Sequence, residues 1–156
     1  MKVILLHGVA GSGKSTLIKH LTKFKKYNII SKDDFRMIDG IYKFEKKYEE
    51  QVEYNFFKSL DYYLRLPVDI IIDNTHLNQE FREKIINKLG SIKPIIISIL
   101  PSKNPQDHVN NNVHGLTIEE IKKQISIYNP PMNSFVFSME ELRKWETIEF
   151  IFSILS

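Results

Sequence analysis

The sequence predicts an α/β fold in which helices cover both faces of a central parallel sheet of about five strands. The prediction rests on the alternation of two kinds of segment. Short apolar runs of strand length alternate along the chain with longer segments whose apolar residues recur at helical spacing. A helix between two strands returns the chain to the starting edge of the sheet, so this alternation produces parallel strands. The 156 residues contain no repeat, low-complexity segment or linker, which predicts a single domain over residues 1–156.

The first half of the chain is expected to contain two short strands and two helices. The apolar run at 2–6 opens into glycines and predicts a buried strand, and helical spacing of apolar residues predicts a helix from 14 to about 25. A second strand is expected at 27–30. Residues 38–46 are expected to form a loop with Asp-Gly as its turn signal. An aromatic-rich helix should then run from 46 to about 66, where a proline ends it.

The second half continues the alternation. A strand is expected at 68–73 and a helix at 78–89, with Asn78 placed to cap its start and Gly90 to end it. Residues 94–100 have the apolar pattern of a fourth strand.

Capping patterns mark the last helices. Residues 101–115 are polar and rich in proline and asparagine. Thr117 and Glu120 then form a capping-box pattern, which predicts a helix reaching about Tyr128. A second pattern of this kind, Ser138 with Glu141, predicts a short helix. The apolar run at 148–155 is interpreted as the last strand.

Composition restricts the class of protein. The chain has no cysteine, which excludes disulfides and thiolate metal sites and fits a reducing compartment. No apolar run approaches the roughly 20 residues that a membrane span requires. These features favour a cytoplasmic protein that has no membrane partner. A net charge of +3 and a pI of about 8.9 are compatible with an anionic partner, and also with many proteins that bind none.

The segment Gly8–Ser15 matches the whole pattern G-x-x-x-x-G-K-[ST] and lies between an expected strand and an expected helix. In that context the backbone N–H groups of the turn face phosphate oxygens, and the helix N-terminus favours the anion. Lys14 is expected to bridge the β- and γ-phosphates, and the Ser15 hydroxyl to bind Mg²⁺. The sequence therefore predicts a site for ATP, or another nucleoside triphosphate, with magnesium. Its expected residues are Gly8, Gly11, Ser12, Gly13, Lys14, Ser15 and Thr16.

Asp73 ends the third expected strand and is followed by further polar residues. Open parallel sheets bind their ligands at the carboxyl ends of the strands. A carboxylate at that point can hold the magnesium shell through water, so Asp73 is a candidate catalytic and metal-binding residue. Asn74 and Thr75 are candidate substrate-binding residues. The alternative for Asp73 is an acid that only caps the next turn.

A charged cluster follows the second expected strand. An acceptor hydroxyl must lose its proton as it attacks a γ-phosphoryl group, and a positioned carboxylate can accept that proton. Asp33 is the candidate base. Arg36, three residues later, can direct a guanidinium fork at an acceptor phosphate. The residues alone equally allow an ordinary helix start, because acids favour the first turn of a helix.

Four ordered segments resemble the bacteriophage-type polynucleotide 5′-hydroxyl kinase family of P-loop proteins. Ser31–Arg36 follows the phosphate loop and Ile71–Asn78 comes later, while Asp39–Phe44 and Val113–Leu116 resemble one branch of that family more closely. The resemblance covers roughly residues 1–130. It implies a P-loop kinase fold with a mobile lid at about 103–128.

The same resemblance implies roles for individual residues. By matching position, Asp33 resembles the general base and Arg36 the clamp on the acceptor phosphate. Asp73 and Asn74 fall at the strand end that supports both and the metal-bound water. His114, in the lid, is a candidate substrate-binding residue. The implied acceptor is the 5′ end of a nucleic acid.

The lid departs from the family pattern. Family lids usually carry an arginine that reaches the transferred phosphoryl group, and this sequence has Asn111 at the corresponding position. Such an arginine can contribute about 10³-fold or more to turnover. Either a lysine (Lys103, Lys122 or Lys123) replaces it or the enzyme is slow.

Three functions therefore remain open from the sequence. The first is a polynucleotide 5′-hydroxyl kinase, which Asp33 and Arg36 support. The second is a kinase for a small molecule or nucleotide on the same scaffold. The third is a nucleotide-binding interaction module with weakened catalysis, which Asn111 suggests.

Overall fold

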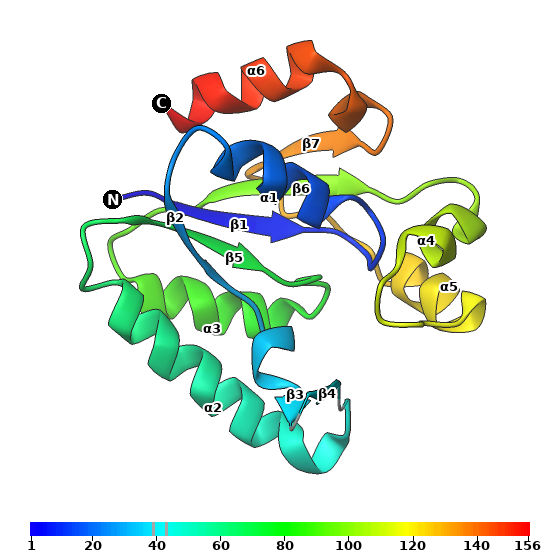
Figure 1. The fold of residues 1–156 in the computed structure, drawn as a ribbon, viewed down its shortest axis with the longest axis horizontal. Helices are drawn as coiled ribbons and strands as arrows, with labels where there is room; N and C mark the ends of the chain where they lie inside the picture. The colour runs from blue at the N-terminus through cyan, green and yellow to red at the C-terminus, as the bar shows by residue number, and fades with distance from the viewer. Residues whose placement is uncertain (39, 43) are drawn as a thin grey trace.

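The protein is described by a computed structural model that covers residues 1–38, 40–42 and 44–156. Within these residues, five parallel strands form one sheet in the order β2-β5-β1-β6-β7. The strands are β1 (Val3–His7), β2 (Tyr27–Ile30), β5 (Asp69–Asp73), β6 (Ile95–Leu100) and β7 (Ser134–Ser138). Helices lie on both faces of the sheet (Figure 1). The predicted α/β class with a central parallel sheet is confirmed.

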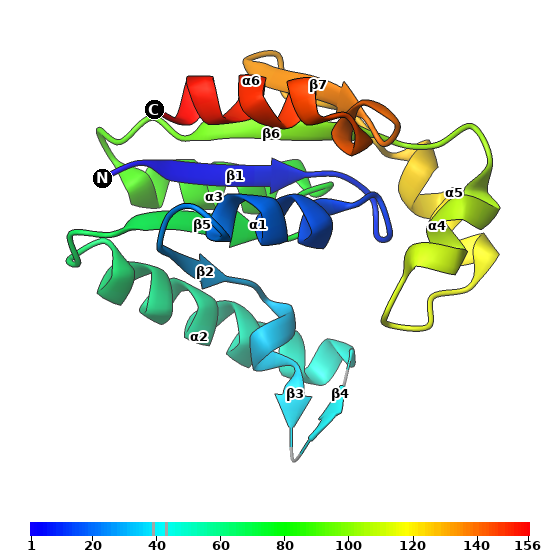
Figure 2. The ribbon, with the colours of Figure 1, turned by 45° about the horizontal axis from the view of Figure 1, so that its top comes forward.

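Two apolar cores lie on opposite faces of the sheet (Figure 2). The helices are α1 (Lys14–Thr22) and α6 (Trp145–Leu155) on one face, and α2 (Lys46–Tyr63) and α3 (Gln79–Leu89) on the other. Alternate residues of β1 enter the two cores: Ile4 and Leu6 pack on the first side, and Val3 and Leu5 on the second. Burial on both faces explains why this strand is a continuous apolar run.

Two small substructures flank the carboxyl edge of the sheet (Figure 1). The first is a 3₁₀ turn followed by an antiparallel hairpin at the start of α2, and the second is a helix pair within the expected lid. Their bounds are η1 (Asp33–Phe35), β3 (Met37–Ile38) and β4 (Ile41–Tyr42), then α4 (Pro105–Asn111) and α5 (Ile118–Ser126). A turn, η2 (Glu141–Arg143), joins β7 to α6.

The predicted caps are present. The Asn78 side chain accepts a hydrogen bond from a backbone N–H in the first turn of α3, and Gly90 follows the last residue of that helix with a φ of 61°. Thr117 and Glu120 form both bonds of the capping box at α5. Ser138 and Glu141 also exchange the two expected bonds, although the element they open is only the 3₁₀ turn η2.

The expected strand at 148–155 is wrong, because these residues lie in helix α6. Ile148, Ile151 and Leu155 are buried at the spacing of one helical face and pack into the same core as α1. The last strand is instead β7, which pairs in parallel with β6. Its sequence, SFVFS, is too short to stand out against the stronger apolar signal of α6, and Phe135 and Val136 are exposed.

Two segments contain elements that the sequence patterns did not predict. The polar segment 101–115 contains α4, which begins with Pro105 and is capped by the Asn104 side chain. The expected loop at 38–46 contains β4, which pairs with β3. Gly40 has a φ of 76°, as a turn requires, while Asp39 lies outside the described residues. No helix of the described residues is long and apolar enough to cross a lipid bilayer.

The helical assignment of α6 is testable by stability. Ile151 is fully buried and Ser153 is exposed. In a strand these two residues would point to the same face, whereas in a helix they do not. Ile151→Ala should lower the free energy of unfolding by about 2–5 kcal/mol through the cavity it leaves. Ser153→Glu should change it by less than about 0.5 kcal/mol. Urea denaturation measures both values, and a large loss for Ser153→Glu would contradict the helix.

Candidate active site

The phosphate loop connects the central strand β1 to α1. Gly11 has a φ of 70° and Gly13 a φ of 99°, conformations that residues with a side chain rarely adopt. No atom lies within 4 Å of the position a Cβ would take on Gly13, so the loop is open on that side. The Gly8 N–H donates to the Thr75 carbonyl (3.1 Å), which ties the loop to the end of β5.

Lys14 lies inside the loop. Its Nζ donates to the carbonyl oxygens of Gly8 and Val9, both at 3.0 Å, and the side chain is buried. Burial lowers the pKa of Lys14, and the carboxylates of Asp73 and Asp33 oppose this effect. The two acids therefore help to keep the ammonium charged where it can contact phosphate oxygens.

A cavity of about 370 Å³ opens over the loop, at the place where the sequence predicts the phosphoryl donor. It will be called the donor cavity. Its walls comprise Ala10–Thr16 of the loop, Lys19, Asp33, Asp73–Thr75, Asn111–His114 of the lid segment, and Met139, Leu142 and Arg143 around η2. Every residue predicted to bind the nucleotide lines this cavity except Gly8, which lies at the root of the loop.

Ser15 and Asp73 fit the requirements of a magnesium ion bound with a nucleotide. Both line the donor cavity and supply hydroxyl and carboxylate oxygens, the donors that Mg²⁺ prefers. Outside residues 39 and 43, no group of three or more His, Asp or Glu side chains is placed to hold a metal. A nucleotide-bound Mg²⁺ needs only one or two protein ligands, because phosphates and water provide the rest. Burial raises the pKa of Asp73, an effect that the charge of Lys14 reduces.

Three side chains from different segments converge on the carboxylate of Asp33. Its Oδ1 accepts hydrogen bonds from Arg36 Nη1 (2.7 Å) and from the Tyr42 hydroxyl (2.9 Å), while His114 Nε2 lies 3.3 Å from Oδ2. The rings of Tyr42 and His114 stack with their centroids 4.6 Å apart. The hairpin and the lid therefore meet at the candidate base. Tyr42 lies in a segment that carries the family resemblance, but its contact with Asp33 was not predicted.

Arg36 is held mainly by acids of this chain. Its Nε and Nη2 donate to the two carboxylate oxygens of Glu49, each at 2.8 Å, and its guanidinium lies over the Phe44 ring, 4.6 Å from the centroid. Burial alone would lower the pKa of Arg36, but the bonds to Glu49 and Asp33 outweigh it and raise that pKa. Three of the five N–H groups of the guanidinium are thus engaged. Arg36 therefore holds Asp33 in place and also lines the larger of the two cavities at the site, and its expected role as an acceptor clamp stays a prediction.

Asn74 and Thr75 position the backbone at the junction of the loops. Asn74 Oδ1 accepts from the Lys32 N–H (2.8 Å), just before Asp33, and the Thr75 carbonyl accepts from Gly8. Both residues also line the donor cavity. Asn74 and Thr75 therefore have a structural role in addition to their expected contact with substrate.

His76 and Arg82 support the same junction. His76 lies in the resembling segment Ile71–Asn78, but neither residue was a predicted site residue. His76 is buried with a positive φ of 52°, and its Nδ1 lies 2.5 Å from the Leu6 carbonyl oxygen. The buried guanidinium of Arg82 donates to the carbonyls of His76 and Leu77. These bonds offset the strain of a left-handed conformation at a residue that carries a side chain.

The helix pair α4–α5 contacts the phosphate loop directly. The Ala10 N–H donates to Gln124 Oε1 (2.8 Å). Because the Ser102 N–H donates to His108 Nε2 (2.8 Å), the hydrogen of that imidazole lies on Nδ1, where it donates to the Ala10 carbonyl (3.2 Å). Asn111, at the position of the expected arginine, lines the donor cavity, as does Arg143 from the other side.

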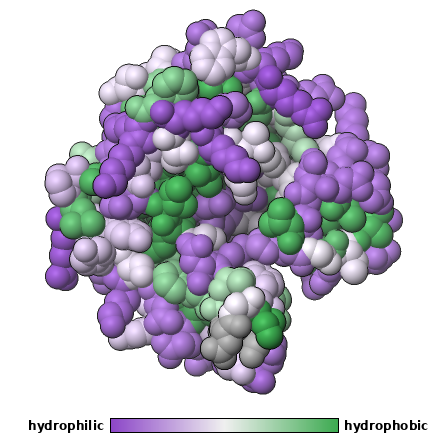
Figure 3. Space-filling view, viewed as in Figure 1, coloured by the Kyte–Doolittle hydropathy of each residue, from purple (hydrophilic) through white to green (hydrophobic). Residues whose placement is uncertain are grey.

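A second and larger cavity, of about 740 Å³, lies between the hairpin side and the lid side and will be called the acceptor cavity. Figure 3 shows a notch at this place, between the regions of β3–β4 and α4–α5. Its lining includes Lys32, Arg36, Tyr42, Phe44, Glu49, Leu116, Lys123 and Gln124. Ala10, Asp33, Asn74, Thr75 and His114 line both cavities. The two cavities therefore meet at Asp33.

These features define a P-loop fold of the kinase type, and this fold implies that the chain binds a nucleotide. A protein-family model described as "AAA domain" matches residues 3–102, and the chain belongs to this family. A search of curated proteins found no matching sequence.

Solved structures of P-loop proteins share the fold at low sequence identity. A gluconokinase from Sinorhizobium meliloti 1021 is 15% identical with a TM-score of 0.66, and the match covers 99% of this chain and 95% of that chain. Kti12 from Chaetomium thermophilum, in complex with ADP-AlF3, is 10% identical with a TM-score of 0.71 over 98% and 96% of the two chains. A chain of a Pnkp1/Rnl/Hen1 complex is 22% identical with a TM-score of 0.60, over 74% of this chain and 40% of that chain.

Gly11 should be intolerant of a side chain for a reason specific to this site. A Cβ on Gly11 would lie in contact with the His108 carbonyl, so Gly11→Ala must displace α4 from the loop as well as strain the backbone. We expect ATP affinity, measured by calorimetry, to fall by about tenfold or more, or ~1.4 kcal/mol. Gly90→Ala is the matched control, because Gly90 also has a positive φ but has open space around it, away from the loop. Equal ATP affinity in the two variants would contradict the proposed contact.

Buried histidines should make the protein sensitive to mild acid. Burial lowers the pKa of His7 to about 4 and that of His76 to about 3, from 6.5 in the unfolded chain. Below pH 6.5 the unfolded chain therefore binds more protons, and the free energy of unfolding falls as the pH falls. Urea midpoints should decrease between pH 7 and pH 5, a range in which ordinary carboxylates titrate little. The decrease should be smaller in His76→Gln, and an equal decrease would refute the role of this imidazole.

Proposed function

We propose that this chain is an ATP-dependent kinase that transfers the γ-phosphoryl group to a hydroxyl, and that the acceptor is the 5′-hydroxyl of a polynucleotide. The observation that carries the proposal is the position of Asp33 at the junction of the donor and acceptor cavities. A carboxylate at this point can contact a hydroxyl that enters from one cavity while a triphosphate occupies the other. A reaction of this kind, with ATP as donor, is also consistent with the expected cytoplasmic location.

The proposed reaction follows from the residues at the junction. The loop amides and Lys14 hold the phosphates, and Asp33 accepts the proton of the acceptor hydroxyl. A bond forms between the acceptor oxygen and the γ-phosphorus, the bond from that phosphorus to the β–γ bridging oxygen breaks, and ADP leaves. Magnesium, when bound, neutralises charge on the β- and γ-phosphates. Ser15 would hold it directly and Asp73 through water.

Arg36 and Glu49 orient the base in this proposal. The bidentate contact between them fixes the guanidinium, which in turn fixes one oxygen of Asp33. Two N–H groups of Arg36 remain for an acceptor phosphate, which retains part of the clamp role that the family resemblance implies.

The polynucleotide acceptor is supported by the order of the four sequence segments that resemble phage-type polynucleotide kinases. The Pnkp1/Rnl/Hen1 structure, described as an RNA repair complex, adds a similar fold over part of the chain. Asn111 replaces the lid arginine of that family. We propose that turnover is slow for this reason, or that His114, Lys123 or Arg143 supplies the missing donor, since each lines one of the two cavities.

A small polyol is the second candidate acceptor, and one observation favours it. Two of the three Lys and Arg residues that line the acceptor cavity, Lys32 and Arg36, already pair with acids of the chain, which leaves Lys123 for a polyanion. A gluconokinase and a sugar kinase also share the fold over nearly their whole length. An acceptor screen with radiolabelled ATP, comparing 5′-hydroxyl RNA and DNA with sugars, sugar acids and nucleosides, separates the candidates. Labelling of small polyols alone would reject the polynucleotide acceptor.

Replacing the candidate base should separate chemistry from nucleotide binding. Asp33→Ala is expected to lower turnover by about 10²–10⁴-fold, the usual contribution of a general base. The affinity for ATP should fall much less than turnover, because Asp33 is not part of the phosphate loop and acts on Lys14 only through its charge. Asp34→Ala is the matched control, since this neighbouring acid lines neither cavity. Turnover that survives in Asp33→Ala, or is lost equally in Asp34→Ala, would show that the base is wrongly assigned.

A further inference from the structure

Phe44 is an exposed aromatic ring at the wall of the acceptor cavity. The residue follows β4, and 67% of its surface is exposed. The Arg36 guanidinium lies over the ring, with Cζ 4.6 Å from the centroid. Arg36 also contacts Asp33, so only the guanidinium group of Arg36 separates the ring from the carboxylate of the candidate base. The exposed part of the ring is a surface on which a planar group could stack close to the reacting hydroxyl.

The charges around the acceptor cavity indicate where a polyanion would run. On the lid side, Lys123 lines the cavity, is exposed and has no ion pair within the described residues. Lys32 and Arg36, on the opposite side, each pair with Glu49. The cation available to a phosphate therefore lies across the cavity from the hairpin.

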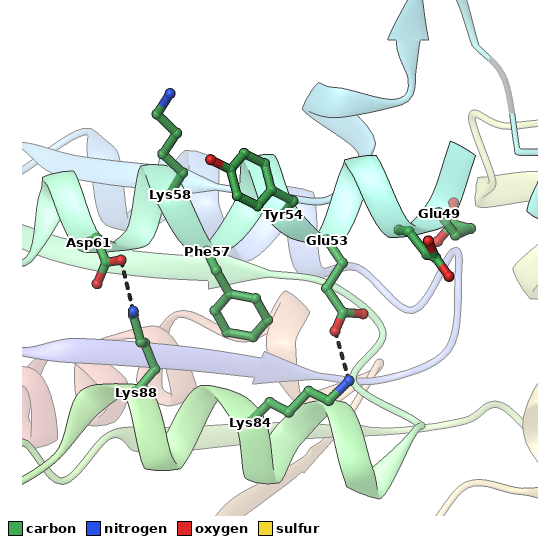
Figure 4. A pocket seen from close by; sticks show the side chains of 9 residues that line it. Glu49, Glu53, Tyr54, Phe57, Lys58, Asp61, Lys84 and Lys88 are labelled. Atoms are coloured by element: carbon green, nitrogen blue, oxygen red, sulfur yellow. Dashed lines mark hydrogen bonds and ion pairs between the residues drawn. The ribbon is translucent and has the colours of Figure 1, made fainter. Parts of the chain in front are cut away.

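A groove between α2 and α3 continues from the acceptor cavity, because Glu49 and Glu53 line both. Figure 4 shows its side chains: Lys84 pairs with Glu53 and Lys88 with Asp61, each at 2.8 Å. These pairs use two of the three lysines that line the groove, and its four acids outnumber them. A polyanion leaving by this route would meet net negative charge. The open side between the hairpin and the lid is the electrostatically favoured route.

We propose that Phe44 is a stacking platform for the base of the 5′-terminal nucleotide of a single-stranded acceptor, and that Lys123 contacts a phosphate of the same strand. This inference rests on the proposed polynucleotide kinase function and adds the form of the substrate. A base in a duplex is stacked on its neighbours and paired, so only an unpaired end can present its face to the ring. The acceptor class is therefore a single-stranded or frayed 5′-hydroxyl end.

The test is a double-mutant cycle. It combines substitution of the Phe44 ring with removal of the nucleobase that the ring is proposed to contact. Phosphoryl transfer from radiolabelled ATP is measured for the wild type, Phe44→Ala and Phe44→Trp. The acceptors are a 5′-hydroxyl single-stranded oligonucleotide, the same strand abasic at the first nucleotide, and one abasic at the third. Base–aromatic stacking contributes about 1–3 kcal/mol, so Phe44→Ala should raise KM for the natural strand by about 5- to 150-fold. Phe44→Trp should restore it.

The abasic strands distinguish stacking from an indirect effect through Arg36. In the wild type, an abasic first nucleotide should raise KM as much as Phe44→Ala does, and the two changes together should cost no more than either alone. An abasic third nucleotide should have little effect. Ile41→Ala is the matched control variant, because Ile41 is 62% exposed on the same hairpin and does not line the cavity. Equal losses by Phe44→Ala on natural and abasic strands would overturn the platform.

Salt dependence tests the contact of Lys123. Each phosphate contact on a single strand contributes about 0.7 to the slope of log affinity against log salt. Lys123→Ala should flatten the slope of log KM by about that amount, whereas Lys122→Ala, on the same helix but outside the cavity, should leave it unchanged. An unchanged slope in Lys123→Ala would overturn this part. If the wild type labels no oligonucleotide, the proposed function itself fails and the platform with it. Labelling without coupling to Phe44 rejects only the platform.

Discussion

The parallel pairing of β1 between β5 and β6 is the constraint on which the candidate site depends. Parallel pairing brings the carboxyl ends of β1, β5 and β2 to one edge, so the phosphate loop, Asp73 and Asp33 become neighbours although they are far apart in sequence. The hydrogen bond from Gly8 to the Thr75 carbonyl fixes the first two of these loops to each other. The bond from Lys32 to Asn74 does the same for the third. Donor and acceptor cavities meet because three strand ends meet.

Hydrogen bonds at this junction hold the carboxylate of Asp33 in one orientation. Arg36 and Tyr42 donate to the same carboxylate oxygen, so side chains from two segments fix its position. Glu49 accepts two hydrogen bonds from the guanidinium of Arg36. These bonds restrict the Arg36 side chain and so fix its bond to Asp33. At Asp73, burial raises the pKa of the carboxyl group, and the charge of Lys14 opposes this effect. The tasks that we propose for the two acids are proton acceptance by Asp33 and support of a metal shell by Asp73.

Sequence patterns predicted the sheet, the phosphate loop and most helices, because these depend on local periodicity and on glycine and capping chemistry. They failed at 148–155, where an amphipathic helix with a wide apolar face was read as a strand, and at 134–138, where a partly exposed edge strand has a weak pattern. They also missed α4, whose polar residues leave no apolar face to detect.

The residues that complete the site were beyond reach of sequence patterns for a different reason. Glu49 contacts Arg36 across thirteen positions, and the contact depends on how α2 packs beside η1. Arg82 reaches the carbonyls of His76 and Leu77, whose positive-φ turn has no glycine to reveal it. Charge, spacing and motif identified the groups that could perform chemistry, whereas tertiary packing determined which groups hold them.

The most direct test of this account is a crystal structure of the protein with ADP, magnesium and a short 5′-hydroxyl strand. The account predicts the 5′-oxygen within about 2.6–3.2 Å of an Asp33 carboxylate oxygen, the reach required of a general base. The β-phosphate of ADP should lie against the loop at Gly13 and Lys14, and the carboxylate of Asp33 should lie on the other side of the 5′-oxygen. Two results would contradict the account. One is a strand bound elsewhere. The other is an Asp33 carboxylate that still contacts His114 and Tyr42, and not the acceptor hydroxyl, while the strand is bound.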